Sequence, residues 1–324
     1  MVPATLGVSF LPPYISLAAD ATATERYAAS ELHEQLAKAC PGVNFTIGKP
    51  LPLTAQIVVG PGAAAALGVS LPSNLEGNES YVIDTTGEMV QASVVLAGGI
   101  GSARGTLYAA YQLLELLGWR FYAADETRVP ALCPATSLVP PHKNVDHLPF
   151  EYRDNNQWAP AHNLTFAVRS GYNGHAPADR GDAVAYATPP GFVHTSYALL
   201  YYPEKSSNVP PPDLFAKHPE WFWPKASQGG ATAYGQLCWS NSSLIKYLTA
   251  QVRAILAAEP DSMILSVSQN DNYNRCRTDA EERINDAEGS PMGALLRAVN
   301  TIADAVKDDW PHVAIDTLAY QWSR

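Results

Sequence analysis

The sequence predicts an α/β protein in two parts: a small N-terminal α/β domain, then an incomplete (β/α) TIM-type barrel of about five strands. Three observations support this prediction. Residues 1–130 alternate short apolar runs with amphipathic helical patterns. Residues 131–149 are rich in proline and lack periodicity, a composition typical of a linker. Residues 150–324 again alternate strand and helix patterns, and polar or aromatic residues follow each apolar run.

In the N-terminal part, proline and glycine separate the predicted elements. We expect an amphipathic helix over 24–36 that stops before Pro41, and a second, strongly apolar helix that begins near Gly105 and ends at Gly118. Apolar runs predict strands at 8–17, 43–47, 56–59, 81–84 and 90–96.

A glycine-rich turn precedes the second of these helices. Gly99, Gly101 and Gly105 are spaced one residue too widely for the usual dinucleotide-binding fingerprint. Asp125, however, lies at about the distance at which such proteins carry the acidic residue that binds the ribose. A tight turn that needs glycine at positive φ explains the same residues and is the favoured interpretation.

After the linker, strands are predicted at 150–156, 191–197, 236–239, 263–267 and 313–320. Ser240 would cap a helix with buried residues from Leu244 to Ile255, and Ser290-Pro291 would begin another from Leu295 to Val306. A complete barrel has eight strands in roughly 250 residues. The chain therefore predicts either a fragment or an open sheet.

The stretch 263–272 organises the second half. Its continuous apolar residues predict a buried parallel strand, and the run stops abruptly in Ser268, Gln269, Asn270 and Asp271. In folds of this kind, functional groups lie where strands end. An Asx-rich turn that caps the next segment is the alternative.

Bulk properties exclude several classes of partner. Hydrophobic residues make up 47% and charged residues 16%, which indicates a folded core. The net charge of −10 argues against nucleic acid and anionic membranes as partners, and no apolar run is long enough to span a bilayer. No signal peptide is evident in residues 1–20, and a secreted or extracytoplasmic location is the expectation. The oligomeric state stays open.

The four cysteines predict no metal centre. Cys40, Cys133, Cys238 and Cys276 are widely scattered, and no pair has zinc-ligand or redox spacing. We expect isolated thiols, and no metal or other cofactor.

Two groups of motifs resemble known families. Residues 104–109 and 118–126 resemble the N-terminal α/β domain of α-glucuronidases and β-hexosaminidases. Residues 218–222, 236–241, 266–272, 289–291 and 316–321 resemble the glycoside-hydrolase-like group catalogued as domain of unknown function 4838. The resemblance implies a carbohydrate-active barrel behind a non-catalytic accessory domain. Members often carry several cysteines just after the block at 270–272; here Cys276 stands alone in residues 273–278, so a metal or disulfide role there is not expected.

Glycoside cleavage normally requires two carboxylates, although a substrate acetamide replaces one of them in some enzymes. The resemblance implies that Asp271 is the acid, because in related barrels the acidic residues follow the fourth strand. Asp154 is the first candidate for the second carboxylate, and Asp316 ranks below it.

Other residues near the predicted strand ends are candidates for binding the sugar. Amides bind hydroxyls, an arginine can clamp a uronate, and a histidine can carry a proton. Arg153 and His194 have alternatives, an ion pair and a structural histidine, and most aromatic residues belong to the core. The predicted binding residues are Gln269, Asn270, Asn272, Arg153, His194, Trp239 and Tyr320.

These observations favour a glycoside hydrolase that acts on a hexosaminide or uronide of a poly- or oligosaccharide. A non-catalytic carbohydrate-binding protein, or a truncated inactive homologue, is the alternative. A nucleotide-dependent enzyme that uses the glycine-rich turn is the third hypothesis.

Overall fold

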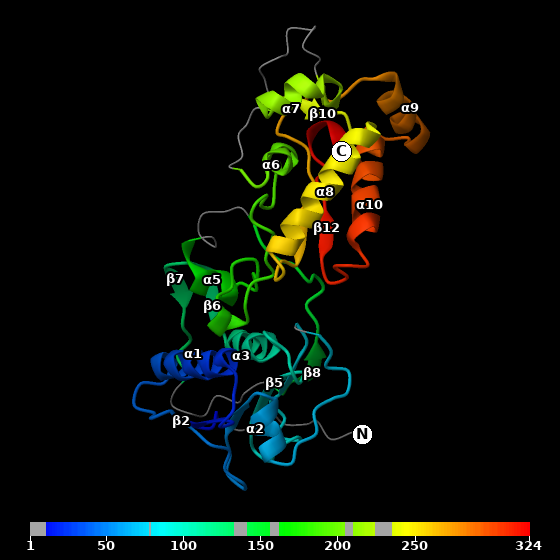
Figure 1. The fold of residues 1–324 in the computed structure, drawn as a ribbon. Helices are drawn as coiled ribbons and strands as arrows, with labels where there is room; N and C mark the ends of the chain where they lie inside the picture. The colour runs from blue at the N-terminus through cyan, green and yellow to red at the C-terminus, as the bar shows by residue number, and fades with distance from the viewer. Residues whose placement is uncertain (1–10, 78, 133–140, 156–161, 205–209, 224–234) are drawn as a thin grey trace. The chain divides into compact units, whose positions relative to one another are not determined.

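The computed structural model describes residues 11–77, 79–132, 141–155, 162–204, 210–223 and 235–324. The chain divides into two compact units, Met1–Val184 and Ala185–Arg324 (Figure 1). The domains predicted from sequence, 1–130, 131–149 and 150–324, stay a prediction. Within the predicted linker, Lys143–Asp146 form a strand of the first unit's sheet, and residues 133–140 lie outside the described residues.

The first unit is built on a six-stranded sheet with the order β2-β1-β3-β5-β4-β8. β2, β1, β3 and β5 are parallel, whereas β4 runs antiparallel to both β5 and β8. In that order the strands span Thr46–Gly48, Tyr14–Leu17, Ile57–Val59, Val94–Gly98, Tyr81–Asp84 and Lys143–Asp146.

Helices cover both faces of this sheet. α1 (Ala23–Ala39) and α3 (Gly105–Leu116) pack against each other and share a core with Ile57 and Val59 of β3. Val58, which points the other way from the same strand, packs with the alanines of α2 (Pro61–Ala66). This alternation places α1 and α3 on one face and α2 on the other.

Local interactions define the ends of the two long helices of this unit. Thr22 caps α1 and makes a reciprocal capping box with Glu25. α3 ends at Leu116, and Gly118 follows with φ of 104°. The remaining elements are the hairpin of β6 (Arg120–Ala123) and β7 (Glu126–Arg128), α5 (Leu164–Arg169) and η1 (Ala178–Arg180).

In the second unit, two long helices pack beside a short parallel sheet (Figure 1). α8 (Ser242–Ala258) contacts α10 (Gly293–Val306), and β11 (Ile264–Ser266) pairs with β12 (Ala314–Asp316). The other elements are α6 (Ser196–Tyr201), α7 (Pro212–Lys217), η2 (Pro219–Trp221), β9 (Phe222–Trp223), β10 (Gln236–Leu237), α9 (Asp279–Glu288) and η4 (Gln321–Ser323).

The fold is mixed α/β with a parallel-strand sheet, as the sequence predicted. A TIM-type barrel is not confirmed. Among the described residues of the second unit, the parallel strands are β11 and β12, and one further bridge joins Tyr186 to Ile264.

Two predicted strands of the second half do not form in the described residues. Residues 150–155 have no strand, and residue 156 lies outside the described residues. At 191–197 the chain turns and enters α6 instead, because Gly191 and His194 have φ of 85° and 54°, which no strand tolerates.

The expectation of isolated thiols was wrong. Cys238 and Cys276 form a disulfide, and Cys40 is also disulfide-bonded. The 38-residue separation of the first pair carries no spacing signal that a sequence alone reveals.

Candidate functional site

The candidate site follows the two parallel strands of the second unit. Ser266 of β11 lies opposite Asp316 of β12, so the segments that follow the strands leave the same edge. Leu265 and Val267 anchor the first segment in the core shared with α8 and α10. Polar side chains that come directly after these strands are thereby held on a rigid scaffold.

Asp271 is brought together with the second segment. Its Oδ1 accepts hydrogen bonds from the Tyr320 hydroxyl at 3.1 Å and from Gln321 Nε2 at 2.8 Å. Asp271 is exposed, and 39% of Tyr320 is accessible to solvent. The predicted acid therefore lies at a surface where a ligand can reach it.

His194 joins the same group. Its ring centroid lies 5.6 Å from that of Tyr320, at an interplanar angle of 51°. Its Nδ1 lies 2.9 Å from the Gln269 carbonyl, and because a carbonyl only accepts, Nδ1 carries a proton and donates it. In the neutral ring, Nε2 is then the acceptor.

Gln269 and Asn270 are buried and hold the loop instead of facing solvent. Gln269 Nε2 donates to the Tyr320 carbonyl at 2.9 Å, and its Oε1 accepts from the Ser323 hydroxyl at 2.5 Å. The backbone of Asn270 is bound on both sides by the Gln236 amide, at 3.0 and 2.7 Å, and its own side chain donates to the Gly235 carbonyl. These amides fix the position of Asp271.

Asn272 and Trp239 have similar supporting surroundings. The Asn272 Oδ1 accepts from Asn274 N at 3.0 Å and from Gln236 Nε2 at 3.2 Å. Trp239 is 1% exposed and lies in the core of the second unit, so its ring presents no open face for a sugar in this structure. The Cys238–Cys276 disulfide beside it ties the loop after Asp271 to the segment that precedes α8.

Glu281, in α9, is a buried carboxylate that the sequence analysis missed. Its two oxygens accept from Trp239 N at 3.3 Å and from Ser240 N at 2.8 Å. Burial raises the pKa of Glu281 above its ordinary value, while these hydrogen bonds and Arg275 act in the opposite direction. The cap of α8 is Asn241, whose Oδ1 accepts from Ser243 N and Leu244 N, and not the predicted Ser240.

Arg153 and Asp154 belong to the first unit. Arg153 Nη2 donates to Glu79 at 2.7 Å and to the Tyr108 hydroxyl at 2.8 Å, and Nε donates to the Gly171 carbonyl. Glu79 also pairs with the buried Arg104. Arg153 therefore forms the ion pair that was the alternative to a sugar-binding role. Its role as a uronate clamp stays a prediction.

The Asp154 side chain is 7% exposed. Its Oδ2 lies 3.1 Å from His175 Nε2 and accepts from the Tyr152 hydroxyl at 3.3 Å, and its Oδ1 accepts from Asn155 N. A Cβ at Gly174 would lie 2.1 Å from Asp154 Oδ2, so glycine is required there for the carboxylate to fit.

Asp316, the lower-ranked second carboxylate, lies on the face of the strand pair opposite Ile315, which packs against the helical core. Its Oδ2 accepts from the Tyr186 hydroxyl at 2.5 Å. Oδ1 is buried without a hydrogen-bond partner, as is the hydroxyl of Thr317 beside it.

In chemical terms, the residues brought together in the second unit are an exposed carboxylate, a phenol and an imidazole. This set can bind hydroxyls and transfer a proton. Within the described residues, no cluster of three or more histidine, cysteine or acidic side chains could hold a metal ion. No helix in that part of the chain has the length and apolar character needed to cross a membrane.

Comparison with known proteins supports the resemblance drawn from the motifs. The sequence model of the family described as "Domain of unknown function (DUF4838)" matches residues 121–324. No curated protein compared with this chain matches it. One similar solved structure is described as a novel family GH115 4-O-methyl-α-glucuronidase with specificity for decorated arabinogalactans; it is 12% identical, with a TM-score of 0.45 over 95% of this chain. The present chain covers 41% of that protein's chain.

Proposed function

We propose, from the premise that this chain belongs to the family described as domain of unknown function DUF4838, that it is a carbohydrate-active protein. Its reaction is the hydrolysis of a glycosidic bond in a poly- or oligosaccharide, a hexosaminide or a uronide. The site is the one formed by Asp271, His194 and Tyr320, and Asp271 is the acid.

One observation carries this proposal: an exposed carboxylate on the loop that follows a buried parallel strand, bonded by groups on the loop that follows the neighbouring parallel strand. In the order α8, β11, α9, α10, β12, helices alternate with parallel strands as in a (β/α) barrel, and in barrels the active site lies at the carboxyl ends of the strands. The barrel itself is part of the proposal.

The chemistry assigned to Asp271 is proton donation to the leaving glycosidic oxygen. Tyr320 and Gln321 hold the carboxyl in place, and the partly exposed Tyr320 ring offers an apolar face to sugar C–H groups. His194 Nε2 is suited to a substrate hydroxyl. Asp154 stays the first proposal for the second carboxylate and Asp316 the second; an acetamide on the substrate is the other route.

A specific observation favours a second candidate, binding without hydrolysis. Among the described residues bonded to one another at the ends of β11 and β12, Asp271 is the one exposed carboxylate. A site with a single acidic group can hold a sugar without cleaving it.

The test compares the protein with its Asp271→Asn variant on methyl N-acetylhexosaminides, methyl glucuronides and the corresponding oligosaccharides, whose leaving oxygens need a proton from the acid. We expect kcat to fall by about 10²–10⁴-fold while the Kd of the same sugar changes little, because proton transfer is lost and shape is kept. Asp286→Asn, an exposed aspartate of α9, is the matched control.

Unchanged turnover in Asp271→Asn removes Asp271 from the mechanism. Sugar binding by the unmodified protein with no hydrolysis of any substrate supports the second candidate. Asp154→Asn, assayed in parallel, tests the proposed second carboxylate, since a residue that takes part in the reaction lowers kcat by a comparable factor.

A further inference from the structure

The sheet of the first unit contains a topological switch point. After β1 the chain enters α1 on one face of the sheet, whereas after the adjacent strand β3 it enters α2 on the opposite face. In open α/β sheets, such a reversal opens a crevice outside the carboxyl ends of the strands, and ligands bind there.

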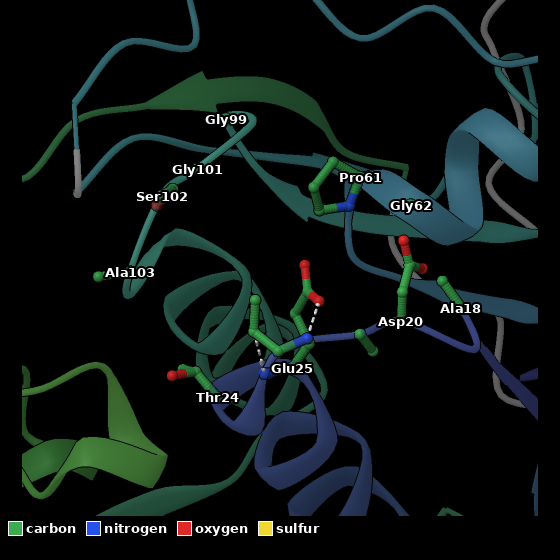
Figure 2. A pocket seen from close by; sticks show the side chains of 12 residues that line it. Ala18, Asp20, Thr24, Glu25, Pro61, Gly62, Gly99, Gly101, Ser102 and Ala103 are labelled. Carbon is green, nitrogen blue, oxygen red and sulfur yellow. Dashed lines mark hydrogen bonds between the residues drawn. The ribbon is translucent and has the colours of Figure 1, made fainter.

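A cavity of about 270 Å³ lies at this position. It is bordered by the segments that follow β1, β3 and β5, as Figure 2 shows. Its volume is near the lower limit of ligand pockets and corresponds to one small polar molecule. The glycine-rich turn is part of its wall, through Gly99 and Gly101.

The charges of the cavity do not suit a phosphate. No lysine or arginine lines it, whereas Asp20 and Glu25 do. Two backbone donors at the starts of α1 and α3 are already used: Glu25 N donates to Thr22 Oγ1 at 3.1 Å, and Gly105 N donates to Ser102 Oγ at 2.9 Å. The carboxylates of Asp20 and Glu25 would repel a nucleotide phosphate.

The cavity instead offers unused acceptors. Glu25 Oε2 accepts from Thr22 N at 2.7 Å, but no described residue donates to Oε1, and none donates to Asp20 (Figure 2). Thr24 is 6% exposed and lines the cavity, and its hydroxyl has no bonding partner among the described residues. The hydroxyl is not among the fully buried polar atoms that lack a partner, so it stays open to the cavity and is available to a ligand.

Glycine at position 60 keeps the carboxylate of Glu25 in place. A Cβ on Gly60 would lie 2.7 Å from Glu25 Oε1, and φ of 90° at this residue is one that other side chains rarely adopt. The carboxylate therefore lies directly against the backbone where β3 passes into α2.

We propose that this cavity is a second binding site, and that its ligand is an amine-bearing monosaccharide. Two carboxylates with free oxygens bind an ammonium group, and the Thr24 hydroxyl and the backbone of the glycine-rich turn bind the ring hydroxyls. This site is independent of Asp271 and of the reaction proposed there.

The test is calorimetric titration of the full chain at low salt and about pH 6, where the amine of D-glucosamine is charged. D-glucosamine is the probe; N-acetyl-D-glucosamine, with the same ring and no charge, and inorganic phosphate are the comparison ligands. We expect D-glucosamine to bind in the millimolar range and salt to weaken it, and we expect the other two to bind at least about tenfold more weakly.

Asp20→Asn and Glu25→Gln are each expected to weaken D-glucosamine binding by about tenfold. Glutamine also completes a capping box, so the second variant keeps α1 intact. Asp125→Asn, an exposed aspartate of the same unit, is the matched control. All three variants are expected to keep the Asp271-dependent activity, which separates a failure here from a failure of the proposed function.

The proposal is overturned if D-glucosamine does not bind, or if its affinity is the same in Asp20→Asn and Glu25→Gln as in the control. Binding of phosphate in preference to the amine, abolished by changes at Gly101 or Ser102, also overturns it and assigns the crevice to an anion.

Discussion

At the scale of single residues, the position of Asp271 depends on the buried amide side chains behind it. Gln236, Gln269 and Asn270 are buried, and their side chains bond the backbone of Asn270, Tyr320 and Gly235 respectively. Asp271 is then the group that emerges. Buried amides that are fully satisfied add rigidity, whereas losing one partner leaves a desolvated group at a cost of about 1–3 kcal/mol.

Glu281 gives a prediction about pH. Burial raises its pKa in the folded protein above the ordinary value of 4.5, so the folded state holds this proton to a higher pH than the unfolded state does. Protonated Glu281 therefore contributes its full stabilisation at pH values below 4.5. This stabilisation is lost as the pH rises through the pKa that Glu281 has in the folded protein. We expect the Tm of the protein, minus that of Glu281→Gln, to fall as the pH rises from about 4 to about 7.

Thermal melts of both proteins across this range measure the difference. A Tm difference that stays constant or rises with pH contradicts the assigned role of burial. Glu288→Gln, an exposed residue of the same helix, controls for the general effect of removing a carboxylate.

The sequence predicted that Asp271 follows a strand, but it did not predict which of the neighbouring side chains are buried. An apolar run that ends in polar residues marks a strand end, and this signal is local. Whether Gln269 faces solvent or the core depends on Tyr320 and Ser323, more than 50 positions later, and Trp239 looks the same in sequence whether its ring is covered or open. Glu281 was missed because its partners are backbone amides of another element.

At the scale of elements, the long helices were predicted well because their apolar residues repeat at helical spacing over three or more turns. The helix expected at 24–36 spans Ala23–Ala39, and most of the apolar residues expected to be buried in α8 and α10 are buried. Leu296, which the pattern also placed in the buried stripe of α10, is 43% exposed. The strand expected at 191–197 was wrong because backbone dihedrals in a short segment depend on Gly191 and on contacts with the β11 loop, where Thr195 and Ser268 are bonded.

The disulfide gives a prediction at this scale. Cys238–Cys276 closes a loop with a sequence separation of 38, which restricts the unfolded chain by about 4 kcal/mol. We therefore expect the Cys238→Ala, Cys276→Ala double variant to lose about 2–4 kcal/mol of unfolding free energy in urea. The loop that carries Asp271 is then held less firmly, so its amides should exchange hydrogen faster.

The measurement is urea unfolding together with hydrogen exchange under non-reducing conditions. The unmodified protein with a reductant is not an adequate substitute, because Cys40 is also disulfide-bonded and would be reduced. Equal stability of the double variant and the unmodified protein contradicts a structural role for the disulfide.

At the scale of the whole molecule, the class of fold was accessible from sequence and the strand pairing was not. Alternating strand and helix patterns indicate α/β structure. The order β2-β1-β3-β5-β4-β8, and the pairing of β11 with β12 across α9 and α10, depend on contacts between distant segments. The switch point, and with it the cavity at Asp20 and Glu25, follows from that order and could not be derived from the glycine spacing.

The central claim is that the carboxyl ends of β11 and β12 form a sugar site. A crystal structure of the Asp271→Asn variant with a bound, uncleaved oligosaccharide tests it most directly. We predict that the scissile oxygen of the sugar lies within hydrogen-bonding distance of the residue 271 side chain and that a sugar ring packs on Tyr320. An oligosaccharide bound elsewhere, with residue 271 and Tyr320 untouched, would contradict the account.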